Sequence, residues 1–410
     1  VWFEDHSGVS DKTTGIFTTA PLANQRAQVS LLWGGDLAGQ TYCRQESVGY
    51  TIFEAMTKMD TDFYVANGDM IYADNACPRK GPLKGWVNLP GNFPGISDNS
   101  VDWLDISQVQ EVYYQHWRYN RSDLPFQKFL QSTSQYVQWD DHEVINDFGA
   151  AWADYPAQPN RAGYPNIVTA GLKSLFDYHP MARHPTESDR IYRSYRWGLN
   201  AELFILDARS YRSKNTSQDS TAKTMLGPKQ LSWLKKGLSR SKATWKIISN
   251  DVPLSIPTGS GAISLGRDAF ADGKNPFTAA ANPGLASTTG FELELLNLLK
   301  YLDKKDVSNI VFIATDVHFA AQLRYEQDFD GDQDTLLFHE LVSGPLSAVR
   351  NPAPPALDPT LHPVVLYAEG DIFNFGTINI DAGTQPVLHS DIRDENGKMR
   401  PGSDLLLAPQ

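Results

Sequence analysis

The amino-acid sequence predicts a globular α/β fold, and three observations support this prediction. From residue 28 onward, short apolar runs alternate with longer segments of helical character. The chain has 410 residues, which is enough to bury a large core in one domain or two. Its composition is 41% hydrophobic and only 20% charged, which excludes an intrinsically disordered protein.

The strands and helices are read from the spacing of apolar residues. Strands are expected where short apolar runs occur, at 28–34, 62–67, 135–139, 202–206, 244–249 and 309–315. Helices are expected at 47–58, 107–119, 123–131, 168–178, 228–239 and 290–303. Pro228 supports the start of its helix, because a missing N–H costs little in the first turn. Later strands of antiparallel character are expected at 335–345 and 373–381.

Three further segments are interpreted from composition. Residues 1–22 predict an N-terminal β-ribbon of two short strands, either laid on the core or left over from an upstream β-domain, and residues 23–410 are expected to form the main domain. The Gly-, Pro- and Ser-rich segment 252–288 predicts a loop or lid near a site. The acidic segment 325–335 resembles a calcium loop but lacks the distal Glu, which favours a solvated hairpin turn.

Charge and hydropathy exclude two classes of function. The net charge of -12 argues against bulk nucleic-acid binding, which requires a basic surface. No run of 18 apolar residues is present, so no membrane-spanning helix is expected.

The chain begins at Val1, and an export signal removed by processing is therefore one expectation. No signal for an oligomer is legible, and a monomer is the default expectation.

Cys43 and Cys77 are the two cysteines of the chain. Two thiols cannot form a zinc ribbon. Each follows a predicted strand end by a few residues, so the two side chains can lie close together, either as a disulfide or as free thiols. A disulfide would stabilise the fold by about 3–4 kcal/mol and would indicate an oxidising compartment.

Ionisable residues follow the carboxyl end of every main predicted strand. The pattern recurs in "SLLWGGD", "FYVANGDMIYAD", "QYVQWDDHEVIND", "LFILDARSYR", "WKIISND" and "IVFIATDVH". It places the following side chains at strand ends: Asp36, Asp69, Tyr72, Asp140, Asp141, His142, Glu143, Asn146, Asp147, Asp207, Arg209, Asp251, Asp316 and His318.

This recurrence predicts a multinuclear metal site. In α/β sheets, ligands bind outside the carboxyl ends of the strands. Carboxylates gathered there cannot all stay ionised without cations, because like charges a few ångströms apart disfavour one another. Any one of these acids alone is more simply a turn or cap residue, and "DDHE" alone fits a helix N-terminus. Their joint occurrence after apolar runs is what favours metal binding.

At these residues the sequence resembles the PhoD-like alkaline phosphatases of the metallophosphoesterase superfamily. The resemblance rests on "WGGDLAGQ", "NGDMIYAD", "QWDDHEVIND", "LDARSYR", "NDVPLS", "ATDVH", "ELVSGPLS" and "FGTINID", which together span about residues 28 to 381. It implies a four-layer α/β/β/α sandwich with two facing mixed sheets. It also implies a site that combines Fe³⁺ with Ca²⁺ and acts on phosphate esters in a secreted or periplasmic location.

The resemblance also implies a ligand set. Asp36, Asp69, Tyr72, Asp316 and His318 match the iron-binding positions, and Asp69 would bridge to calcium. Asp141, Asn146 and Asp251 would complete the calcium shell. Some members of the family have Cys where this chain has Asp36. The harder ligand leaves Zn²⁺, Mn²⁺ or an all-calcium site open as alternatives.

Two residues are candidates for catalysis. His142 would protonate the leaving alkoxide, or alternatively orient Asp141 or a metal ligand. Arg209 would bind a substrate oxygen through its guanidinium fork, or alternatively form an ion pair with Asp207 or Glu202.

The resulting functional expectation is hydrolysis of a small-molecule phosphate ester by attack of metal-activated water or oxide. The leading interpretation is an alkaline phosphomonoesterase with some diesterase activity. A phosphodiesterase of the phospholipase D type on the same scaffold, acting on a phospholipid or another diester, is the first alternative. A calcium-binding protein that has lost catalysis is the second. The loops at 75–105 and 252–288 are expected to decide between monoester and diester.

Overall fold

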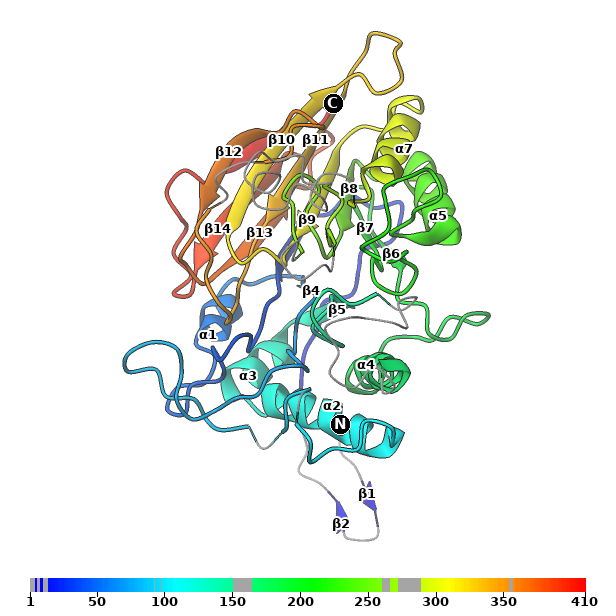
Figure 1. Ribbon diagram of the computed structural model, residues 1–410. Helices are drawn as coiled ribbons and strands as arrows, with labels where there is room; N and C mark the ends of the chain where they lie inside the picture. The colour runs from blue at the N-terminus through cyan, green and yellow to red at the C-terminus, as the bar shows by residue number, and fades with distance from the viewer. Residues whose placement is uncertain are drawn as a thin grey trace.

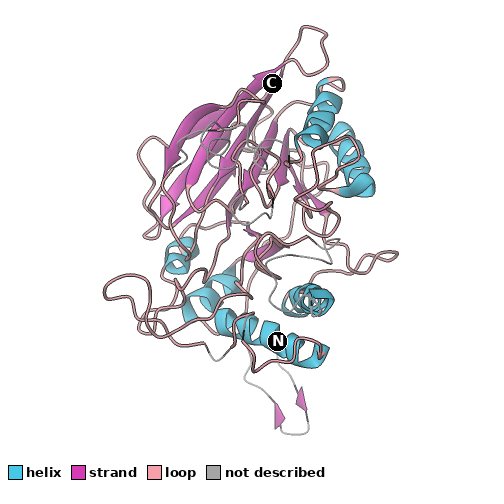
Figure 2. Cartoon of the chain, viewed as in Figure 1, coloured by secondary structure: helices cyan, strands magenta, loops and turns pink. Residues whose placement is uncertain are grey.

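The computed structural model describes the chain except residues 1–3, 6–7, 10–13, 92, 97, 150–163, 260–265, 272–288 and 354–356. Two large sheets face each other, and helices cover their outer surfaces (Figures 1 and 2). This arrangement confirms the predicted four-layer α/β/β/α fold. No helix of the described residues is both long and apolar enough to cross a membrane.

The larger sheet is mixed and has seven strands. Its neighbouring order is β12 (Val364–Glu369), β10 (Ala320–Gln327), β11 (Leu336–Val342), β9 (Ile310–Ala314), β8 (Trp245–Ser249), β7 (Ala201–Ile205) and β6 (Arg193–Trp197). The central strands β7, β8, β9 and β11 are parallel, and the outer strands pair antiparallel. The parallel strands therefore bring their carboxyl ends to one edge of the sheet.

The smaller sheet has six strands. Its order is β15 (Leu405–Leu407), β14 (Leu388–Asp394), β13 (Asn374–Ile380), β3 (Val29–Gly34), β4 (Phe63–Asn67) and β5 (Ser134–Gln138). Strands β3, β4 and β5 are parallel, and the remaining pairs are antiparallel. A short pair, β1 (Glu4–Asp5) and β2 (Gly8–Val9), forms a separate two-stranded sheet within the predicted N-terminal ribbon (Figure 1).

Helices pack on each outer face because each has one apolar side. The six-stranded sheet is covered by α1 (Ile52–Thr57), α2 (Ile106–Arg121), α3 (Leu124–Ser132) and α4 (Tyr164–Tyr178). The seven-stranded sheet is covered by α5 (Gly227–Arg240) and α7 (Glu292–Asp303). Asp105 and Asp123 cap α2 and α3 by accepting from backbone N–H groups of the first turn.

Three apolar layers hold the four structural layers together. One lies between the six-stranded sheet and its helices, and another between the seven-stranded sheet and α5 and α7. The third lies between the two sheets, where Trp33 and Val65 from the smaller sheet join Ile247 and Val311 from the larger one. The two sheets are thus one packed unit, and this fixes the relative positions of their strand ends.

The helices and strands expected from the sequence are present, with ends that differ by a few residues. The exception is the helix expected from residue 47, which begins only at Ile52. Strands β6, β10, β12, β14 and β15 were not expected from the sequence. The hairpin turn favoured for 325–335 is confirmed, since β10 and β11 pair antiparallel with Gln327 opposite Leu336. Of the loop 252–288, residues 260–265 and 272–288 lie outside the described part.

Candidate metal centre

The residues that follow β3, β4 and β9 adopt an unusual backbone conformation. Asp36, Asp69, Asp316 and His318 have φ angles of 59°, 53°, 73° and 61°. This left-handed region costs energy for a residue with a Cβ atom and is concentrated at functional sites. Backbone bonds hold the turns in place: the N–H of Leu37 donates to the carbonyl of Asp69 at 2.8 Å. All four residues thus share a backbone conformation that is often found at functional sites.

Two glycines allow the strand ends to approach closely. A Cβ atom on Gly35 would lie 2.3 Å from the carbonyl oxygen of Gly68, so the chain between β3 and Asp36 accepts no side chain there. Gly344 has φ of 102°, and a Cβ atom on it would lie 2.4 Å from Oδ2 of Asp36. The glycines of "WGGD" and "SGP" therefore serve the packing of the site.

A first group of candidate ligands joins both sheets. Ligand atoms of Asp36, Asp69 and His318 all lie within 4.8 Å of one another. Nδ1 of His318 lies 2.7 Å from the carbonyl oxygen of Val349 and donates to it, so Nε2 is the ring nitrogen that faces the other candidate ligands. Nε2 lies 3.0 Å from the hydroxyl oxygen of Tyr72, within hydrogen-bond distance, and 3.4 Å from Oδ1 of Asp36.

Two more groups extend the first. Asp69, Asp141 and His142 form one, and Asp140, Asp141 and Asp316 form another. Within these three groups Asp69 occurs twice and Asp141 twice, so single carboxylates connect neighbouring positions that could each hold a cation. These shared carboxylates form clusters that could hold metal ions, and the multinuclear site stays a prediction.

Several buried carboxylate oxygens in these groups have no hydrogen-bond donor. They are both oxygens of Asp36 and one oxygen each of Asp140, Asp141 and Asp316. Burial, followed by the charge of Asp141, raises the pKa of Asp69 well above its ordinary value, and the same two causes raise the pKa of Asp316. Unpartnered oxygen donors with one imidazole and one phenol fit hard and borderline cations. The residues present therefore fit a metal centre.

His142 is held by its neighbours on three sides. Its Nδ1 lies 2.7 Å from Oδ1 of Asp74, and its backbone N–H donates to Oδ1 of Asp69 at 3.0 Å. Its ring stacks on Tyr72 with centroids 4.1 Å apart. Burial alone would lower the pKa of His142, but the carboxylates of Asp74 and Asp141 outweigh it and raise the pKa to about 10. The same pairing lowers the pKa of Asp74 despite burial.

The side chain of Arg209 is fully buried, and its guanidinium group is bonded to carboxylates. Its fork donates to Asp268 at 2.8 and 2.7 Å, and its Nε donates to Asp140 at 2.7 Å and lies 3.3 Å from Asp251. The sequence suggested substrate binding by this fork, or an ion pair with Asp207 or Glu202. Asp207 instead accepts from the backbone N–H of Arg209, and Glu202 pairs with Arg196. Neither expected acid is thus the partner of its side chain.

The other predicted residues lie at different depths. Asp69, Asp141, His142, Asn146, Asp316 and His318 line a cavity of about 410 Å³. Asp36, Tyr72 and Asp251 are buried beneath its surface. Asp251 accepts from Nε2 of Gln138 at 3.2 Å, and Asn146 donates its backbone N–H to Oδ2 of Asp74 at 3.1 Å. One wall of the cavity is uncharged and comes from the loop after β8, at Ile256, Pro257, Thr258 and Gly259.

Three residues that support the site were not assigned roles from the sequence. Glu143 accepts the backbone N–H groups of Asp69, Met70 and Asp140, and so ties the ends of β4 and β5 together. Asp74 holds His142, and Asp268 holds Arg209. Glu143 and Asp74 lie inside motifs rich in acids, which was an available signal. Asp268 lies in an irregular loop, where no strand end marks it.

Cys43 and Cys77 form a disulfide, with their Cα atoms 5.8 Å apart. The open alternative of two free thiols is therefore wrong. The bond links the loop after β3 to the loop after β4, and Phe93 packs against it. It ties together the two loops that follow Asp36 and Asp69.

Comparisons with known proteins show the family to which the chain belongs. A model of the family described as PhoD-like phosphatase matches residues 31–385. Alkaline phosphatase D of Bacillus subtilis (strain 168) is 24% identical over 329 residues, which cover 76% of this chain and 50% of that protein. The chain thus spans about half the length of this curated relative. A solved structure described as PhoD covers 96% of this chain and 71% of its own, with a TM-score of 0.68 and 17% identity, and it shows the same fold. The chain belongs to the PhoD-like phosphatase family.

Proposed function

We propose that this protein hydrolyses phosphate esters with bound metal ions, with phosphate monoesters as the preferred substrates and some activity on diesters. The observation that carries the proposal is the set of unpartnered, buried carboxylate oxygens at the strand ends beneath the 410 Å³ cavity. The family and the relative named alkaline phosphatase D support the same reaction class. The intact acids argue against a protein that has lost catalysis.

We propose that two sets of residues hold different cations. Asp36, Asp69, Tyr72, Asp316 and His318 would hold Fe³⁺, because carboxylate and phenolate oxygens suit a hard trivalent ion. Asp69, Asp141, Asn146 and Asp251 would hold Ca²⁺, which prefers oxygen ligands. The membership of Asp69 in two ligand groups supports its role as a bridge. Zn²⁺ or Mn²⁺ are the alternatives for the first set.

In the proposed reaction the metal ions and the side chains of the protein have separate roles. Bound cations would neutralise the phosphoryl oxygens and lower the pKa of a bound water that attacks phosphorus. The chain supplies the proton for the leaving group. Nδ1 of His142 is engaged by Asp74, so the proton on Nε2 is the one available to the leaving alkoxide. Asp74 keeps this ring in one orientation, and Tyr72 stacks against its face.

Arg209 acts in this proposal as a positioning residue. It lies behind the carboxylates and offers a fixed positive charge to Asp140 and Asp251. Asp268 occupies its fork and balances the charge from the other side. The guanidinium group of Arg209 thereby holds Asp140 and Asp251 at set positions without contacting the substrate.

Hydrolysis of p-nitrophenyl phosphate and bis-p-nitrophenyl phosphate should be compared from neutral to alkaline pH, with and without a strong chelator. We expect faster hydrolysis of the monoester, and loss of activity as the chelator removes the metal. Faster hydrolysis of the diester would favour the phosphodiesterase or phospholipase D-type alternative. Activity that survives complete metal removal would contradict the proposal.

The role of His142 has its own test. His142→Ala should lower the rate by about 10²–10⁴-fold for an alkyl phosphate, whose poor leaving group needs a proton. The loss should be much smaller for p-nitrophenyl phosphate. Equal losses for both substrates, with metal content unchanged, would assign His142 to orientation of Asp141 instead.

A diesterase is the second candidate, and the volume of the cavity is compatible with it. A volume of about 410 Å³ lies within the usual range of small-molecule sites, so a second substituent on phosphorus has room.

We also propose a secreted or periplasmic location, because disulfides persist in oxidising compartments. The proposed partner is a small phosphate ester, and the proposed state is a monomer.

A further inference from the structure

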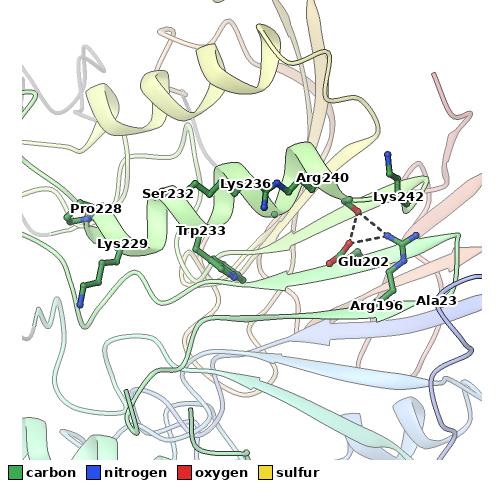
Figure 3. Close-up of a pocket in the computed structure, with 12 residues that line it drawn as sticks. Ala23, Arg196, Glu202, Pro228, Lys229, Ser232, Trp233, Lys236, Arg240 and Lys242 are labelled. Atoms are coloured by element: carbon green, nitrogen blue, oxygen red, sulfur yellow. Dashed lines mark hydrogen bonds and ion pairs between the residues drawn. The ribbon is translucent and has the colours of Figure 1, made fainter. Parts of the chain in front are cut away.

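A cavity of about 1060 Å³ lies along α5, beside the edge strand β6 (Figure 3). It shares no lining residue with the cavity over the metal centre. Its walls come from α5, from the two residues after this helix, from β6 and β7, and from Ala23. It is therefore a second concave site, and the chemistry of its lining determines which ligands it can hold.

One face of α5 supplies most of the lining. Lys229, Trp233, Lys236 and Arg240 follow one another at spacings of four, three and four residues, which places them on one side of the helix. A typical outward face of a helix mixes both signs of charge, but this one has three cations and no acid. Lys236 and Arg240 are an i, i+4 pair of like charge, which is unfavourable for the helix alone.

The cavity collects positive charge on an acidic protein. Arg196, Lys229, Lys236, Arg240 and Lys242 line it together with a single acid, Glu202. The whole chain has 36 basic and 48 acidic residues, so five cations beside one acid is a local reversal of charge. Such a concentration attracts anions into a concave site.

The single acid does not neutralise these cations. Glu202 lies 3.1 Å from NH1 of Arg196 and also accepts from the hydroxyl of Ser241 at 2.6 Å. Within the part of the chain that the structure describes, the side chains of Lys229, Lys236, Arg240 and Lys242 have no carboxylate partner. Four cations thus remain available to a ligand.

The cavity also has a flat apolar surface. Trp233 points from α5 toward the strands of the larger sheet (Figure 3). Its ring centroid lies 5.0 Å from that of Tyr192 and 6.0 Å from that of Phe204, and the guanidinium of Arg190 lies 5.6 Å from it. These contacts fix a half-buried indole among the cations. A ligand that uses both features must combine negative charge with a planar apolar part.

We propose that this cavity binds a small organic anion that has at least two negative charges and a flat apolar portion. The charges would lie against the α5 cations and the apolar portion against Trp233. Binding would relieve the repulsion between Lys236 and Arg240. The site is separate from the metal centre, and the proposal does not depend on the proposed hydrolysis.

The test uses the aromatic dianion bis-ANS as the probe. Its fluorescence is titrated at low ionic strength against the native protein, the double variant Lys236→Glu/Arg240→Glu and the control Lys128→Glu/Lys300→Glu. The control reverses two exposed charges on α3 and α7 and changes the net charge equally. We expect one saturable site in the native protein and the control, and roughly tenfold or greater weakening in the α5 variant. Equal affinity of the α5 variant and the control would overturn the proposal.

Two further measurements sharpen the result. Pyrophosphate has the charges without the apolar part, so it should displace bis-ANS only at concentrations roughly tenfold or more above those of the dye. Displacement at equal concentration would overturn the apolar part of the proposal. Thermal unfolding and p-nitrophenyl phosphate hydrolysis of the α5 variant should match the native protein. If this variant does not fold, Lys229→Glu/Lys242→Glu is used in its place, with the same expected weakening.

Discussion

Replacing Asp268 by Asn is expected to destabilise the fold by at least about 2 kcal/mol at neutral pH. The buried carboxylate accepts from Arg209 at 2.8 and 2.7 Å, from Asn215 at 2.8 Å, and also from Arg212. Burial alone would raise its pKa, but the two guanidinium groups outweigh this and lower the pKa from 3.8 to about 2. At about 1.4 kcal/mol per pKa unit, this shift corresponds to about 2 kcal/mol of stability.

The pH dependence of this effect has a defined sign. Because the folded pKa of Asp268 lies below the unfolded one, its contribution is fully present above the unfolded pKa and disappears as the pH falls through about 2. The deficit of Asp268→Asn should therefore be about 2 kcal/mol or more at pH 7 and about half of that at pH 3. Removing a partner from a buried ion pair typically costs about 3–5 kcal/mol, which sets an upper range here because Arg209 keeps Asp140 and Asp251.

Urea unfolding followed by far-UV circular dichroism at pH 7, 5 and 3 measures the deficit. The matched control is Asp60→Asn, because Asp60 is exposed and its left-handed backbone tolerates Asn. The control should differ from the native protein by less than about 0.5 kcal/mol. A deficit for Asp268→Asn as small as that of the control, or one equal at pH 7 and pH 3, would refute the electrostatic reasoning.

Three other outcomes are expected. Asp69→Asn should lose bound metal and activity together, because two ligand groups share this carboxylate; full metal content with full activity contradicts the assignment. Burial raises the pKa of Glu340 to about 7, so the native protein should lose about 3 kcal/mol of stability as the pH rises from about 4.5 to about 7. Glu340→Gln should remove this loss. Urea midpoints of both proteins at pH 5 and pH 8 would show it. Replacing Cys43 and Cys77 by Ala opens a link across 34 residues and should cost about 3–4 kcal/mol, whereas a reductant should then have no further effect.

The periodic parts of the fold were predictable and the polar edges were not. Strands β3, β4, β8 and β9 are almost wholly buried, so their apolar runs stand out in the sequence. Strand β6 has the sequence "RSYRW" and β12 has three exposed residues, because both are sheet edges that face solvent. Strand β14 buries Ser390 and Asp391, which breaks the apolar alternation. Edge position and buried polar groups depend on neighbours that a local pattern does not contain.

The candidate site was predictable where it lies on strand ends. Parallel strands bring their carboxyl ends together, so the acids after β3, β4 and β9 could be grouped before their positions were known. Asp268, which binds the fork of Arg209, could not be grouped with them, because it lies in an irregular loop with no periodic signal. Which of these residues line the cavity and which are buried behind it could not be predicted from the sequence either. Asp251 and Arg209 share the pattern of the cavity-lining acids but lie behind them.

The left-handed backbone at Asp36, Asp69, Asp316 and His318 limits how these positions can be interrogated by mutagenesis. Val, Ile or Thr at any of them would clash with its own backbone, so a loss of function would report a misfolded turn as readily as a missing ligand. Asn is the replacement whose side chain tolerates this conformation; it removes the negative charge at the three aspartates and the imidazole at His318. A saturation library at these four codons should therefore be interpreted through its Asn members, with Gly as the measure of what the turn alone requires.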